Sequence, residues 1–231
     1  MMGRTTIESL EALGLLRRWL AMALPQEAQA WIDLEIERQL AGPDENRLVT
    51  ALGLAGRKLR RAELQLPAEE LAAAQDLCPD WRPQYWGADE VARAALLLAT
   101  HRGDDGAFVN RYEKLCVTAE TTEHVSYMKG LAIFPAGEQL VRSARQGLRS
   151  SISPIFRAVA CHNPYPRNQF DIDVWNQMVV KCVFEGVPID DVTGLHARRN
   201  PELLVMLRDL VSERHAAGRP LPQAVHRFIE G

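Results

Sequence analysis

The side chains best suited to chemistry lie close together, between residues 161 and 182. They include an imidazole, amides, aromatic rings and an ammonium group, the donors and acceptors that a pocket for a polar small molecule needs. The candidate ligand-binding residues in this stretch are His162, Asn163, Tyr165, Trp175, Asn176, Gln177 and Lys181. A structural alternative stays open, because buried rings and amides also lock a loop onto a helix.

Asn176 is the residue on which the two interpretations differ most. It falls between apolar neighbours on the expected helix, and an unsatisfied buried amide costs about 1–3 kcal/mol. Its partners could be the turn at 163–166 or a bound ligand.

Two prolines around Tyr165 predict a stiff, non-helical turn before the next helix. Each proline fixes its own φ and disfavours helical geometry at the residue before it, so Asn163 and Tyr165 are expected to be extended. Asp171 is expected to cap the helix that follows, with Phe170 and Trp175 forming a hydrophobic staple.

An arginine stripe precedes this turn. Arg142, Arg145 and Arg149 are spaced so that a helix would place them on one face. Guanidinium groups gathered in this way could hold a phosphate, which makes Arg145 and Arg149 further candidates for ligand binding. The alternative is a solvated helix surface, with Glu138 four residues before Arg142 and able to pair with it.

Other patterns predict neither a metal site nor a catalytic cysteine, and we expect no cofactor. Asp104 and Asp105, close after His101, are better explained as a helix cap than as a metal loop. Cys161 and His162 are adjacent, and adjacent residues rarely point at each other; the sequence also holds no nucleophile elbow.

Composition predicts an ordinary soluble, cytoplasmic protein. The chain has 231 residues, 47% of them hydrophobic and 25% charged, with a net charge of −3, so it has no global basic field for nucleic acid. Its basic run at 57–61 is expected to be a solvated helix end. The four cysteines lack C-x-x-C spacing, which fits a reducing compartment. Arg17 and Arg18 interrupt the apolar stretch at 10–24, so neither a signal peptide nor a membrane span is expected.

Apolar residues recur at helical spacing along almost the whole chain and predict an all-α fold of about ten helices. Caps are expected at Asp44, Asp105 and Thr121. We predict a multi-helix bundle or solenoid of antiparallel helix pairs, similar to HEAT or armadillo repeats from about residue 88. Residues 1–77 are expected to form an N-terminal helical array and 88–231 a helical-repeat region that carries the candidate site, together one continuous compact unit.

The same segment carries a resemblance to a known family. The motifs are Asn163-Pro164-Tyr165-Pro166, Phe170-Asp171, Trp175-Asn176-Gln177-Met178, Lys181, Asn200-Pro201-Glu202-Leu203 and Ala216-Ala217-Gly218-Arg219-Pro220. In these the chain resembles EboA-domain proteins, most densely over about 147–220 and faintly back to about 105. The N-terminal third carries no matching motif.

The resemblance implies an all-helical protein of a bacterial ebo-type gene cluster. Neighbouring genes there encode proteins that resemble a prenyltransferase, a sugar-phosphate cyclase, a metal-dependent hydrolase and a sugar isomerase. The family's own activity is not settled, so the resemblance carries over no catalytic residue.

Three functional hypotheses follow. The first is an accessory protein of a secondary-metabolite pathway that binds a polar metabolite, cyclitol-like or sugar-phosphate-like and prenylated or not, or that docks pathway enzymes. The second is an enzyme acting on a phosphorylated sugar or cyclitol, in which Arg145 or Arg149 would hold phosphate and His162, Tyr165 or Lys181 would move protons. A purely structural interaction partner is a third hypothesis, and its mark would be a large exposed apolar patch. The expected partners are a metabolite or pathway enzymes, and no nucleic acid or membrane segment.

Overall fold

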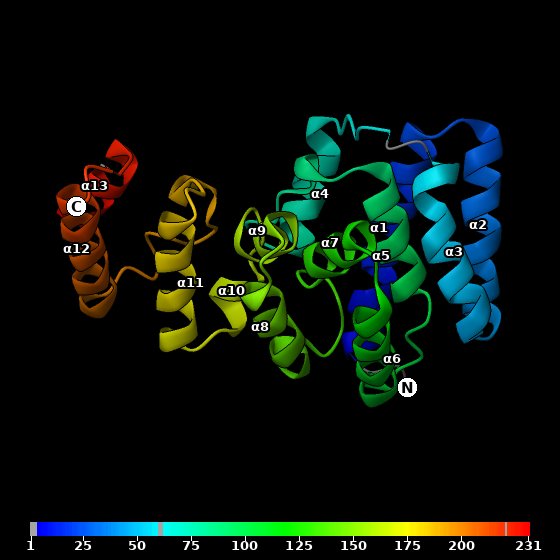
Figure 1. The fold of residues 1–231 in the computed structure, drawn as a ribbon. Helices are drawn as coiled ribbons and strands as arrows, with labels where there is room; N and C mark the ends of the chain where they lie inside the picture. Colours follow the sequence, from blue (N-terminus) through cyan, green and yellow to red (C-terminus); the bar gives the residue numbers. More distant parts are fainter. Residues whose placement is uncertain (1–3, 60–61, 220) are drawn as a thin grey trace.

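The computed structural model of the chain confirms the all-α fold (Figure 1). It describes residues 4–59, 62–219 and 221–231, and in these ranges the only extended pairing is one isolated bridge between Glu63 and Gly87. The α-helices are α1 (Arg4–Ala23), α2 (Gln26–Ala41), α3 (Glu45–Lys58), α4 (Ala68–Leu77), α5 (Ala88–Leu98), α6 (Asp105–Thr118), α7 (Thr121–Gly130), α8 (Val141–Arg149), α9 (Ser153–Ala160), α10 (Tyr165–Gln169), α11 (Ile172–Phe184), α12 (Pro201–Ala216) and α13 (Gln223–Glu230). Three short 3-10 helices join them: η1 (Pro83–Tyr85), η2 (Gly137–Leu140) and η3 (Ile189–Asp191).

Side-chain caps account for several helix starts. Asp44 and Asp171 each accept a hydrogen bond from the backbone N–H three residues on, as the sequence predicts. Helix α6 starts earlier than expected, because its cap is Asp104 and Asp105 is already helical. Of the basic run at the end of α3, Arg60 and Arg61 lie outside the described residues.

The expectation of a non-helical turn around Tyr165 is wrong. Tyr165 is the first residue of α10, and Pro164 before it has helical backbone angles (φ −74°, ψ −12°). Pro166 is the second residue of α10, where a proline lacks only an N–H that has no acceptor within the helix. The two prolines therefore begin a helix. The unusual backbone lies three residues before Tyr165, at His162, whose φ is 55°.

Helix α5 lies at the centre of the N-terminal half. It packs against α1, α2, α3 and α7, and each of its residues except Glu90 is buried. The segment 78–87 that leads into α5 is also packed. Trp81 is 1% exposed, and its ring centroid lies 5.3 Å from that of Trp19 and 5.4 Å from that of Trp86. Residues from both sides of this segment thus contribute to one hydrophobic core.

The later helices follow one another along the molecule (Figure 1). Helix α7 packs against α9, α9 against α8 and α11, and α11 against α12, which carries α13 at the end far from α2 and α3. This order places residues 161–191 in the middle of the molecule. A HEAT-like or armadillo-like repeat stays a prediction. Within the described ranges, no helix combines the length and apolarity needed to cross a membrane.

Candidate functional site

A cavity of about 530 Å³ lies where η1, α7, α9, η3 and the turn before α10 meet. We call it the His162 cavity. It is lined by Tyr85, Trp86, Val125, Lys129, Pro154, Arg157, Ala158, Cys161, His162, Asn163 and Asp191. Its volume lies within the range of about 300–1,000 Å³ that is typical of small-molecule sites, and its wall mixes apolar side chains with a few polar groups, as such sites do.

His162 is held firmly in this wall. Its ring stacks on that of Tyr85, with centroids 3.6 Å apart and planes inclined by 3°. Its backbone N–H donates to the Asp191 carbonyl at 2.8 Å, and its Nε2 lies 3.7 Å from Asp191 Oδ1. The other ring nitrogen, Nδ1, is buried without a hydrogen-bond partner in the protein. A left-handed backbone at a residue other than glycine, with an unused ring nitrogen, is the kind of strain that gathers at functional sites.

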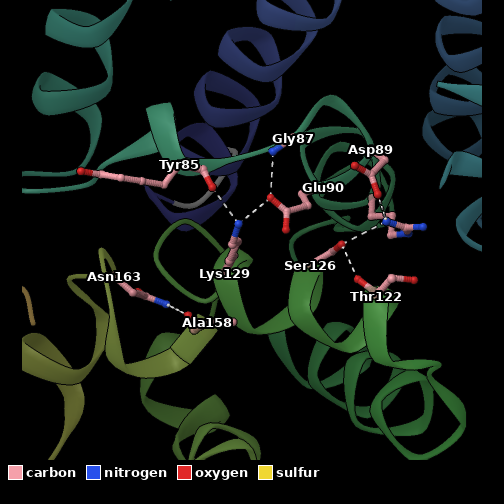
Figure 2. A network of polar contacts seen from close by, with 10 residues as sticks. Tyr85, Gly87, Asp89, Glu90, Thr122, Ser126, Lys129, Ala158 and Asn163 are labelled. Carbon is pink, nitrogen blue, oxygen red and sulfur yellow. Dashed lines mark hydrogen bonds and ion pairs between the residues drawn. The ribbon is translucent and has the colours of Figure 1, made fainter. Parts of the chain in front are cut away.

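Two cations face the cavity, and they are held differently. The Lys129 ammonium reaches from α7 to the Tyr85 carbonyl at 2.8 Å and to Glu90 Oε2 at 2.6 Å (Figure 2). Arg157 is half-exposed, and its Nη2 lies 3.6 Å from Asp191 Oδ2. Lys129 therefore fixes the position of Tyr85, whereas the guanidinium of Arg157 keeps free donors for a ligand.

Burial sets the protonation of the His162 cavity. It lowers the pKa of His162, with the Asp191 carboxylate opposing the shift and nearby arginine and lysine side chains adding to it. The imidazole is therefore neutral near pH 7 and can accept or donate one hydrogen bond through Nδ1. Burial also raises the pKa of the Cys161 thiol to about 12, so this thiol stays protonated and is a poor nucleophile.

Asn163 shapes the wall from within the protein. Its Nδ2 donates to the Met128 and Ala158 carbonyls, both at 3.0 Å, and its Oδ1 accepts from the Tyr165 N–H at 3.0 Å (the Ala158 bond is drawn in Figure 2). Both amide hydrogens are thus used inside the fold. Tyr165 points elsewhere: its hydroxyl donates to the Gly137 carbonyl at 2.6 Å, beside a separate cavity of about 400 Å³.

A smaller cavity, of about 260 Å³, lies between α8 and α11. Arg145, Arg149, Gln177 and Lys181 are in its wall, and it shares no lining residue with the His162 cavity. The candidate residues are therefore divided between different places. His162 and Asn163 line the larger cavity, and the three cations with Gln177 line the smaller one.

The chain matches the family model described as metabolite traffic protein EboA over residues 12–230. It belongs to the EboA family. The match includes α2, α3 and α4, where the motifs of the sequence showed no resemblance, so the N-terminal helices are part of the family's domain. No curated protein and no solved structure is significantly similar to the chain. In the described parts of this EboA chain, no group of three or more His, Cys, Asp or Glu side chains is placed to hold a metal ion.

Trp175 and Asn176 are packed inside the EboA domain. The Trp175 ring is fully buried, and the Arg198 guanidinium lies 4.9 Å from its centroid. Asn176 exchanges two hydrogen bonds with Asn200, one donated each way, at 3.2 and 2.8 Å. Asn200 also caps α12 by accepting from the Leu203 N–H. Within the protein, the partner of Asn176 is thus the start of the next helix and not the turn at 163–166.

We expect Asn176→Ala to lower the free energy of unfolding by about 1–3 kcal/mol, because the buried Asn176 amide and its two hydrogen bonds with the partly buried Asn200 would be lost. Urea denaturation followed by circular dichroism measures this loss. The matched control is Asn168→Ala on α10. The Asn168 side chain is exposed and accepts a bond from Arg167, so its loss should cost less than about 0.5 kcal/mol. Equal stability of the Asn176 variant and the wild type would show that the amide pair contributes nothing to the fold.

The pH dependence of stability should report the burial of His162. Because its pKa is lower in the folded chain than in the unfolded chain, the unfolded chain binds more protons once the pH falls below about 6.5, and His162 then subtracts from stability. Between about pH 7.5 and 5.5 the wild type should lose more unfolding free energy than His162→Asn, since asparagine tolerates positive φ and does not titrate. His124, whose pKa burial also lowers, is present in both chains and cancels. Parallel pH profiles would contradict the assignment.

Sequence reasoning missed most of the His162 cavity. Tyr85, Lys129, Arg157 and Asp191 come from four segments well separated along the chain. Tyr85 carried the one usable signal, since it stands in a loop rich in prolines and tryptophans. Its side chain is 50% exposed, unlike the buried tryptophans beside it.

Proposed function

We propose that this chain is a non-catalytic accessory protein of metabolite traffic that holds a polar small molecule in the His162 cavity. The observation that carries the proposal is the stacked pair of Tyr85 and His162, which shares the cavity wall with the half-exposed Arg157, while His162 Nδ1 is buried without a hydrogen-bond partner in the protein. The family description supports the accessory role.

The chemistry of the wall favours a ligand with two kinds of surface. Val125, Pro154 and Ala158 supply apolar contact, while His162 and Arg157 supply directional donors. A cyclitol or a sugar phosphate would use the donors, and a prenyl chain on such a molecule would use the apolar side. We favour a hydroxylated ligand of this type over docking of a pathway enzyme, because the polar groups converge inside a concave site.

An enzyme acting on a phosphorylated sugar or cyclitol is the second candidate. The observation in its favour is the position of Asp191, whose carboxylate lies 3.7 Å from His162 Nε2, an arrangement similar to a general base and its orienting acid. The neutral state of His162 is compatible with such a base. The protonated Cys161 adds no nucleophile, so the cavity would offer a single proton acceptor with one partner.

Native mass spectrometry of protein purified gently from its own host tests the proposal. The wild type should retain an extra small-molecule mass, and His162→Asn should lose it. The control is Arg208→Gln, at an exposed position of α12 that is not part of the cavity wall, and it should keep the adduct. Bare protein in all samples, or protein joined to a pathway enzyme in all of them, would overturn the pocket. Conversion of the released ligand on incubation with fresh protein would favour the enzyme.

A further inference from the structure

The charged side chains that line the smaller cavity between α8 and α11 are all positive. Its described lining consists of Arg145, Arg149 and Lys181, the amide of Gln177 and three apolar side chains, and it includes no carboxylate. A concave site walled by cations on one side and apolar groups on the other attracts an anion that also carries some carbon.

The two arginines of this cavity have no side-chain partner among the residues that the structure describes. In the described ranges neither Arg145 nor Arg149 forms an ion pair or a side-chain hydrogen bond, and the pair of Arg142 with Glu138 that the sequence allows is not formed either. Two arginines of α1, adjacent in the sequence, behave differently: Arg17 pairs with acidic residues of α2, and Arg18 pairs with one of α4. Like charges three or four residues apart on a helix repel one another, and a bound anion between Arg145 and Arg149 would remove that repulsion.

Lys181 is already held in place and contributes charge without being a free donor. Its ammonium donates to the Leu148 carbonyl at 2.6 Å and to the Ser150 carbonyl at 3.2 Å, and lies 3.4 Å from a carboxylate oxygen of Glu185. The ring of Phe156 lies against it, with the centroid at 4.5 Å. These contacts occupy the three ammonium hydrogens, so hydrogen bonds to a ligand must come from the arginines and from Gln177.

We infer that this cavity is a second ligand site, which binds the phosphate group of a phosphorylated small molecule between Arg145 and Arg149. Planar guanidinium forks match the oxygens of a phosphate, and Gln177 can donate to the same group. Leu148, Val174 and Met178 then contact the carbon part of the molecule. The site does not depend on the His162 cavity, with which it shares no residue.

Titration with inorganic phosphate, followed by ¹H–¹⁵N NMR spectra at constant ionic strength, tests the inference. We expect saturable shifts of backbone amides in α8 and α11, with a dissociation constant that rises at least about tenfold in Arg145→Gln/Arg149→Gln. Arg208→Gln removes an exposed arginine of α12 that has no side-chain partner in the described structure, and it should leave the constant within about twofold. Both variants change exposed or half-exposed positions, so both should fold.

A second titration, with glucose 6-phosphate and with glucose, tests the carbon part of the ligand. The phosphate ester should bind more tightly than inorganic phosphate at the same amides, and glucose should cause no shifts there. His162→Asn should bind phosphate like the wild type, which separates this site from the proposed metabolite cavity. Shifts that do not saturate, that are equal in the double variant and the wild type, or that appear around His162 instead, would overturn the inference.

Discussion

Arg93→Met should lower the free energy of unfolding by about 3–5 kcal/mol, because it leaves a buried carboxylate without its partner. The Arg93 side chain is 3% exposed, and its Nη1 lies 2.7 Å from Asp89 Oδ2 and 3.2 Å from Ser126 Oγ. Its Nε also donates to the Leu52 carbonyl of α3 at 3.1 Å. Methionine keeps the apolar stem but removes every one of these donors. Asp89 belongs to α5 and Ser126 to α7 (Figure 2), and Leu52 belongs to α3, so Arg93 joins three helices.

Urea denaturation monitored by circular dichroism measures the effect. The double variant Asp89→Asn/Arg93→Met should recover more than about 1 kcal/mol of the loss, since the unpaired charge is gone. Arg208→Met, at an exposed position of α12, should change stability by less than about 0.5 kcal/mol. A loss below about 1 kcal/mol for Arg93→Met would mean that water reaches the pair and that its burial does not set its energy.

The fold class was predictable because its signals are local. Helical spacing, the caps Asp44 and Asp171 and the breakers each act within one or two turns of chain. The turn at Tyr165 shows the limit of such rules. A proline disfavours helix at the residue before it, but at the first turn the penalty is small, and the contacts of Asn163 with two backbone carbonyls decide the geometry.

The candidate site was predictable only in part, because a cavity is a product of tertiary packing. Side chains that are close in sequence point in different directions on α11. Asn176 turns inward to Asn200, whereas Lys181 turns toward the end of α8. The groups that complete the His162 cavity arrive from η1, α7, α9 and η3. Nothing in the spacing of Tyr85 and His162, 77 positions apart by number, indicates that their rings stack.

A fragment of residues 88–231 should fail to fold cooperatively, and this is the largest effect that we expect. Every residue of helix α5 except Glu90 is buried, and α1, α2 and α3 provide three of the helix's neighbours. Removing them would expose Val91, Leu96 and other side chains that are now fully covered, at about 25 cal/mol for each Å² of apolar surface returned to water. The buried Arg93 would also lose the Leu52 carbonyl.

Far-UV and near-UV circular dichroism during heating, together with binding of a hydrophobic dye, distinguish the outcomes. The fragment should keep some helix, lose its near-UV signal and bind the dye. The matched control removes residues 221–231 instead, because α13 contacts α12, η3, His196 and Arg199 at the far end of the molecule; that chain should still melt in one transition. A sharp transition of the 88–231 fragment within a few degrees of the full chain would contradict this expectation and would show that residues 88–231 fold independently of α1–α4. If the fragment does not melt cooperatively, α5 needs α1–α3 to cover it. The His162 cavity then depends on these helices too, since Tyr85 and Trp86 of its wall lie in the segment just ahead of α5.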